Sequence, residues 1–75
     1  MMNSEQCRMA RAGLKLGAQE LASLAGVSYP SLNRFEKGER VSDGTVESIR
    51  GALEKAGAQF SRRAGRVGAT VPERD

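Results

Sequence analysis

Between residues 28 and 34 the chain gathers side chains that donate and accept hydrogen bonds. They are Ser28, Tyr29, Ser31, Asn33 and Arg34. A guanidinium or an amide can make paired hydrogen bonds to a planar partner, and a hydroxyl can donate or accept single bonds. Leu32 and Phe35 stand among them at the spacing of a helix face that turns inward. This pattern predicts a short helix with a polar face that is free to contact a partner.

The sequence contains few of the residues that catalysis or metal binding usually requires. The chain has no histidine, so its single cysteine, Cys7, has no imidazole base. One cysteine without histidine also excludes the usual zinc clusters. No glycine-rich phosphate loop follows a strand. We therefore expect neither an enzyme nor a resident cofactor or metal, and we interpret Cys7 as a small core residue.

Size and charge set further limits. A chain of 75 residues makes one small domain, which buries a smaller share of its surface than a larger domain does. The net charge of +3 is compatible with a nucleic-acid partner without being diagnostic of one. No apolar run approaches the ~20 residues of a membrane span, and residues 1–8 lack the apolar core of a secretory signal. One cysteine cannot form an internal disulfide, so we expect a cytoplasmic protein that does not bind a membrane.

The spacing of apolar residues, together with residues that favour helix starts and ends, predicts four helices. Serine and asparagine are favoured caps at helix starts, and glycine commonly ends a helix in the left-handed conformation. Asn3 or Ser4 is the expected cap of a first helix that runs from Glu5, and Ser28 and Ser42 are the expected caps of the third and fourth helices. The expected ends lie before Gly17, Gly26, Gly38 and Gly57. The second helix is expected over about residues 18–25.

Residues 58–75 differ in character from the rest of the chain. A run rich in arginine is followed by alternating apolar and small residues at 67–71, which is typical of a strand. We therefore predict an all-α domain over residues 1–57, followed by a short strand or hairpin arm over 58–75. Arg62, Arg63 and Arg66 have three open interpretations: a disordered tail, phosphate contacts, or contacts to an acidic partner.

The two short helices on either side of Gly26, joined by a three- to four-residue turn, form a helix-turn-helix pattern. The chain from about Ser4 to Phe60, roughly three quarters of its length, resembles the Cro and phage-repressor type, or XRE-like, helix-turn-helix DNA-binding family. The resemblance is carried by the segments ARAGLKL, QELASLAGVS, LNRFEKGERV and TVESIRGALEKAGAQF. It implies that the second helix of the motif lies in the major groove of double-stranded DNA.

The resemblance also implies roles for individual residues. Arginine can pair with guanine and asparagine with adenine. The residues expected at base edges are Tyr29, Ser31, Asn33 and Arg34. Those expected at phosphates are Gln19, Ser28, Lys37, Arg40 and Lys15. Arg11 and Glu36 occupy places that often form a partly buried ion pair in this family, so we expect them to hold the fold.

By resemblance, the protein would be a sequence-specific transcriptional regulator, most simply a repressor. A two-fold dimer would place two copies of the reading helix about 34 Å apart on a palindromic operator. We expect the dimer surface in the fourth helix and the C-terminal segment. Its expected residues are Leu53, Phe60, Val67 and Val71.

Two other functions stay open. One is an antitoxin that represses its own gene and binds a toxin through the C-terminal arm, residues 61–71. The other is a protein-interaction module that has lost DNA binding. Gly17, Ala18 and Pro30 motivate this second alternative, because relatives commonly place Ser or Thr, Gln and Gln at these positions.

Overall fold

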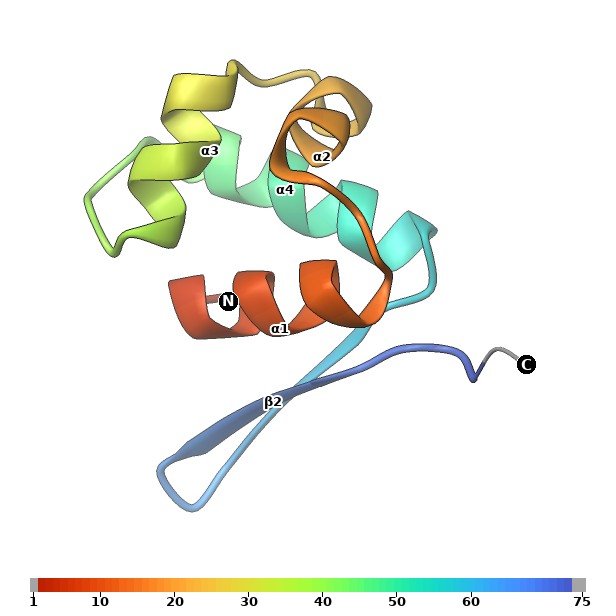
Figure 1. Ribbon diagram of the computed structural model, residues 1–75. Coiled ribbons are helices and arrows are strands. Elements are labelled where there is room, and N and C mark those ends of the chain that lie inside the picture. Colours follow the sequence, from red (N-terminus) through yellow and green to blue (C-terminus); the bar gives the residue numbers. More distant parts are fainter. Residues whose placement is uncertain (1, 74–75) are drawn as a thin grey trace.

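The computed structural model describes residues 2–73, in which four helices are followed by a two-stranded antiparallel hairpin (Figure 1). The elements are α1 (Ser4–Gly13), α2 (Ala18–Ala25), α3 (Tyr29–Glu36), α4 (Asp43–Lys55), β1 (Gln59–Arg63) and β2 (Arg66–Thr70). The helices lie together, and the hairpin crosses α1 on the side away from α2 and α3 (Figure 1). The predicted mostly helical class with a C-terminal hairpin is confirmed.

Helix starts follow the predicted capping residues. Asn3 accepts a hydrogen bond from the Gln6 N–H at 2.9 Å, and the Gln6 side chain accepts one from the Asn3 N–H at 3.0 Å. This reciprocal pair is a capping box, and it starts α1 at Ser4, one residue earlier than the predicted Glu5. Ser28 and Ser42 each accept the N–H three residues later, at 3.2 Å. Local capping therefore explains where three of the helices begin.

The core is built from the inner faces of all four helices, together with Met2 and Ala58. Its buried apolar side chains are Met2, Cys7, Ala10, Leu14, Leu21, Ala22, Leu32, Phe35, Val46, Ile49, Leu53 and Ala58. Cys7 is completely buried, as expected for a small core residue. Leu53 also exposes none of its surface. Its expected role as a dimer contact is therefore wrong, because the core of a single chain already covers its side chain.

The hairpin has a two-residue turn and a regular register. Arg63 lies opposite Arg66, and Phe60 lies opposite Ala69. Between the strands, Ala64 and Gly65 have φ angles of 52° and 75°, the left-handed pair that a tight type I′ turn requires. Three arginines, at positions 62, 63 and 66, lie within these strands rather than in a disordered tail.

Gln6 ties the hairpin to α1. Its Nε2 group donates to the backbone oxygens of Ser61 and Gly68, at 2.8 and 3.1 Å, so one side chain holds both strands. Farther along, the side chain of Val71 lies so close to Gly13 that a Cβ there would be 3.0 Å from Val71 Cγ2. The hairpin is consequently packed on the helical domain and does not extend from it as a free arm.

Candidate nucleic-acid interface

α2 and α3 form a helix-turn-helix. Gly26 ends α2 with a φ of 70°, and the Val27 N–H donates to the Ala22 oxygen at 3.0 Å, which closes the turn. Leu32 and Phe35 then face the core from α3. One side of α3 is fixed against the other helices, so its remaining side lies at the surface (Figure 1).

The four residues expected at base edges all lie on α3. Tyr29 is 43% exposed, and Arg34 is also exposed. Ser31 and Asn33 are half-buried. Tyr29 and Arg34 therefore offer the most accessible surface, while Ser31 and Asn33 can contribute only through their exposed portions.

A short chain of hydrogen bonds orients Arg34. The Ser28 hydroxyl donates to Ser31 Oγ at 2.9 Å, and Arg34 Nη2 donates to the same oxygen at 3.3 Å. Among the described residues this is the only side-chain hydrogen bond of Arg34. The guanidinium is thus directed along α3 toward its first turn and keeps most of its N–H groups for a partner.

The residues expected at phosphates surround α3 without lying on its inner face. Lys15 lies in the α1–α2 connection, and Lys37 and Arg40 lie after α3, all three exposed. These two connecting segments lie on opposite sides of the α2–α3 pair (Figure 1). Positive charge therefore flanks the exposed face of α3, an arrangement suited to the two backbones that border a groove. Gln19 and Ser28, in or next to the first turns of α2 and α3, are also exposed.

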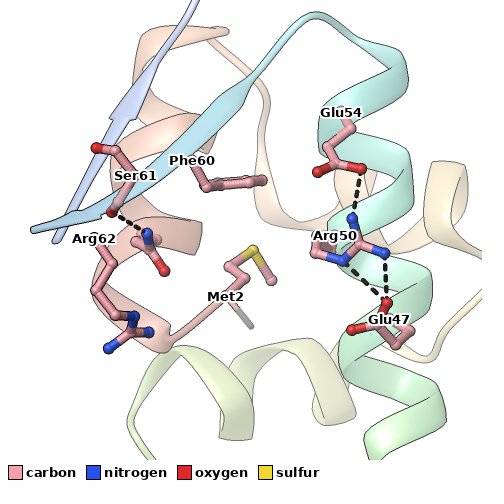
Figure 2. Close-up of a pocket in the computed structure, with 8 residues that line it drawn as sticks. Met2, Glu47, Arg50, Glu54, Phe60, Ser61 and Arg62 are labelled. Carbon is pink, nitrogen blue, oxygen red and sulfur yellow. Dashed lines mark hydrogen bonds and ion pairs between the residues drawn. The ribbon is translucent and has the colours of Figure 1, made fainter.

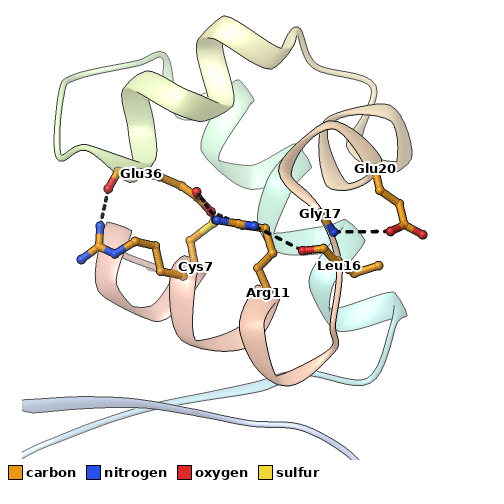
Figure 3. A network of polar contacts seen from close by, with 7 residues as sticks. Cys7, Arg11, Leu16, Gly17, Glu20 and Glu36 are labelled. Carbon is orange, nitrogen blue, oxygen red and sulfur yellow. Dashed lines mark hydrogen bonds and ion pairs between the residues drawn. The ribbon is translucent and has the colours of Figure 1, made fainter.

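The start of α2 carries an acidic group that the sequence analysis did not single out. Gly17 has no side chain to cap the helix, and its N–H donates to Glu20 Oε1 at 3.4 Å (Figure 3). The Glu20 carboxylate thus occupies part of the positive end of α2, where a phosphate would otherwise gain from the helix dipole. Gln19 consequently becomes the more suitable phosphate contact at this end.

An ion pair joins α1 to the end of α3. Arg11 Nε lies 2.8 Å from Glu36 Oε2, and Arg11 Nη2 lies 2.9 Å from Glu36 Oε1, so the pair is bidentate (Figure 3). Arg11 Nη1 also donates to the Leu16 oxygen at 3.2 Å. This is the pairing that the family resemblance implies. It connects α1, the α1–α2 connection and α3, and so it fixes the orientation of α3.

Two further side chains join this network. The thiol of Cys7 donates to Glu36 Oε2 at 3.3 Å, and Arg8 Nη1 donates to the Glu36 backbone oxygen. Burial, followed by the nearby charge of Glu36, raises the pKa of the Cys7 thiol from 9.0 to about 12. The hydrogen bond to Glu36 raises the pKa of Arg11. The thiol is therefore protonated and covered, which is the opposite of a reactive cysteine.

Sequence reasoning missed the capping box of Asn3 and Gln6, the bonds from Gln6 to the hairpin and the bond from Arg8 to Glu36. The Asn3–Gln6 spacing could have indicated a capping box, but nothing near Gln6 in the chain indicates its bonds to the hairpin. Arg8 gave no signal beyond its charge. Of the residues expected at a dimer surface, Phe60 and Val71 are half-buried and pack against the core, and Val67 is half-buried in β2.

Comparison with protein-family models and with curated proteins finds no match for this chain. Within residues 2–73, no group of three or more His, Cys, Asp and Glu side chains is placed to hold a metal ion. None of the described helices has the length and apolar character needed to cross a membrane.

Proposed function

We propose that this protein is a cytoplasmic, sequence-specific DNA-binding regulator of transcription that acts as a homodimeric repressor. In this proposal α3 enters the major groove, and Arg34 and Tyr29 make the principal base contacts. Ser31 and Asn33 add contacts at the margin of this surface. Repression would be steric, through occupation of a promoter, and would need neither catalysis nor a cofactor.

The observation that carries the proposal is the contrast between the two sides of α3. On one side, the core and the Arg11–Glu36 pair hold the helix in place. On the other side, Arg34 is exposed and oriented by Ser31. A rigid helix with an oriented guanidinium can form paired hydrogen bonds to guanine at little entropic cost.

The flanking residues support the same proposal. Lys37 and Arg40 would neutralise phosphates on one side of α3, and Lys15 and Gln19 would contact the backbone on the other. The Ser28 hydroxyl already accepts the Ser31 N–H and so caps α3. A substitution of Ser28 would therefore change both the helix cap and the proposed phosphate contact.

No specific observation favours the antitoxin alternative. A C-terminal segment that is disordered alone and gains order only with a partner would favour it, whereas Gln6 bonds to both strands of a folded hairpin. A protein-interaction module that has lost DNA binding would release no counterions from DNA, so it would not show an affinity for DNA that falls with salt concentration.

Selection of bound duplexes from a random DNA pool tests the proposal. We expect enrichment of a palindromic site whose half-sites lie about 10 base pairs apart. The logarithm of the affinity should fall with the logarithm of the salt concentration, with a slope of about −0.9 per phosphate neutralised. A pool that yields no enriched sequence, together with affinity that does not change with salt, would contradict DNA binding.

A further inference from the structure

The outer face of the hairpin carries a shallow hollow. Phe60 and Ala69 pack against the core, so their neighbours along each strand point to the opposite face of the sheet. Figure 2 shows this alternation at Phe60, which is directed toward α4, and at Ser61, which is directed away from it. The hollow has a volume of about 380 Å³ and is lined by Ser61, Arg63, Ala64, Arg66, Val67 and Gly68.

Gly68 leaves the floor of this hollow open. It pairs with Ser61 across the hairpin, and a Cβ at Gly68 would lie only 3.0 Å from Ser61 Oγ. Gly68 does not have a positive φ angle, so the backbone does not require glycine at this position. Within residues 2–73 the Ser61 hydroxyl makes no hydrogen bond, because the contact of Ser61 with Gln6 goes through the backbone oxygen. The hydroxyl therefore lies beside open space and can donate to a ligand.

Two arginines border the hollow directly opposite each other. Arg63 on β1 and Arg66 on β2 form the last pair before the turn, and both are exposed. The Cα atoms of such a pair lie about 5.5 Å apart, and like charges directly opposite each other are unfavourable in a sheet. Among the described residues neither arginine has an ion pair, whereas Arg11 and Arg50 each bond to glutamate. An anion between Arg63 and Arg66 would offset their repulsion.

The C-terminal segment supplies no such anion. Residues 56–72 contain three arginines and no aspartate or glutamate. The hairpin also crosses α1 on the side away from α2 and α3, so its outer face is directed away from the helix-turn-helix (Figure 1). A duplex held by α3 would lie on the other side of the domain. The anion that fits the hollow therefore comes from a different molecule.

We infer that the hollow binds an acidic segment of a partner protein. One aspartate or glutamate carboxylate would lie between Arg63 and Arg66 and accept hydrogen bonds from both guanidinium groups. A second carboxylate, above Gly68, would accept the hydrogen bond of the Ser61 hydroxyl. These two positions lie two residues apart along the strands, about 7 Å, which is also the spacing of alternate side chains in an extended peptide. An extended segment with acidic residues at alternate positions therefore matches the hollow.

This contact requires neither DNA binding nor folding on binding. The hollow and α3 lie on opposite sides of α1, so each can be occupied without the other (Figure 1). Gln6 already bonds to both strands of the hairpin, so the partner would meet a preformed surface. It would not have to order the segment, as the antitoxin alternative expects.

The number of charges favours a protein partner over nucleic acid or lipid. Binding that is driven by phosphates commonly involves roughly 6–10 contacts, and recognition of anionic lipids involves clusters of about 4–8 basic residues. The hollow offers only two arginines. Single-stranded nucleic acid also stacks its bases on aromatic side chains, and Phe60, the one aromatic residue of the hairpin, packs against the core on the other face. Two guanidinium groups and a hydroxyl suit a few carboxylates.

A nuclear magnetic resonance titration of the full chain with two synthetic peptides tests the inference. One peptide alternates aspartate with glycine, and its matched control has asparagine in place of every aspartate. We expect the acidic peptide to shift the resonances of Ser61, Arg63, Arg66 and Gly68 and to leave those of α3 unchanged. The asparagine peptide, which has the same length and spacing without the charge, should cause no shift.

Three variants separate the hollow from the net charge of the protein. Arg66→Gln should weaken binding of the acidic peptide roughly two- to five-fold, as expected for one exposed ion pair, and should be at least as stable as the wild type. Gly68→Ala keeps every charge but should also weaken binding, because its Cβ displaces the Ser61 hydroxyl. The control is Lys55→Gln, which removes one exposed positive charge at the end of α4 and should bind like the wild type.

Several results would overturn the inference. They are equal shifts with both peptides, shifts confined to α3, and equal affinities of Arg66→Gln and Lys55→Gln for the acidic peptide. Tighter binding of single-stranded DNA or of phosphatidylglycerol vesicles at the same four residues would assign the hollow to another class of partner and would also overturn it. If Gly68→Ala does not fold, Ser61→Ala tests the same hydroxyl. Duplex binding is measured at α3, so the failure of either proposal leaves the other standing.

Discussion

Arg11, Arg34 and Arg50 each make hydrogen bonds to side chains, but their surroundings differ. Arg11 holds Glu36, which is only 9% exposed, and joins α1 to α3. Within residues 2–73, the side chain of Arg34 bonds only to Ser31 and that of Arg50 only to glutamates, in each case on its own helix. Both arginines reach the surface. A bond between elements with a buried partner fixes the fold, whereas a bond within one exposed helix leaves the side chain available to a ligand. Substitutions at these arginines' partners should therefore differ in their effect on stability.

The largest effect on stability is expected at the buried ion pair. Glu36→Ala leaves Arg11 without its carboxylate and removes the acceptor of the Cys7 thiol. Removing one partner of a buried pair is strongly destabilising, and because Arg11 is 26% exposed we expect the lower end of that range, about 3 kcal/mol. Urea unfolding followed by circular dichroism measures this loss. An unchanged unfolding midpoint would show that the pair does not hold α3.

The next effect is expected where the hairpin joins α1. Gln6→Ala removes both bonds to the strands and half of the capping box, so we expect a loss of about 2 kcal/mol. Amide hydrogen exchange should become faster in β1 and β2 than in α3. Gln6→Glu is the matched control, because it keeps an acceptor for the Asn3 N–H but loses the donors to the hairpin. Equal protection of the hairpin in all three proteins would contradict the anchoring role.

The Cys7 thiol gives an effect that depends on pH. The folded protein keeps this proton up to a pKa of about 12, whereas the unfolded chain releases it near pH 9.0. The folded state therefore holds more protons between these values, so stability is complete below pH 9 and falls as the pH rises toward 12. The contribution is at most about 1.4 kcal/mol per pH unit. As the pH rises above 9, the free energy of unfolding should fall less in Cys7→Ser than in the wild type. Parallel curves of unfolding free energy against pH would show that the Cys7 thiol does not cause the loss.

The smallest effect is expected on α4. Glu54→Ala removes one exposed contact of Arg50, within a single helix, and solvent screens such pairs. We expect no measurable change in the melting temperature, although the same substitution at Glu36 lowers it clearly. A comparable loss at both glutamates would remove the distinction between the two kinds of ion pair.

Local signals in the sequence predicted the helices because caps and helix ends act over only a few residues. Ser28, Ser42 and Gly26 each produced the expected boundary. The bonds from Gln6 to the hairpin span 55 and 62 positions, and no local pattern encodes them. The Arg11–Glu36 pair came from the family resemblance, since its spacing of 25 residues carries no periodic signal.

The error at Leu53 has a physical reason. An apolar residue near the end of a helix can face a partner copy or its own core, and both cases give the same periodicity. Leu53 follows Val46 and Ile49 at intervals of three and four residues, and all three are buried together. Its position on that stripe indicated the core of the single chain.

The most direct measurement compares Arg34→Ala with Arg40→Ala on a selected duplex and on the same duplex with single base changes. We predict that Arg34→Ala keeps its circular dichroism spectrum and loses about 1–3 kcal/mol of discrimination, roughly 10- to 100-fold, at one base pair of each half-site. Arg40→Ala should weaken every duplex by a similar factor. If Arg34→Ala discriminates as well as the wild type, the exposed face of α3 does not read sequence, and the central proposal is wrong.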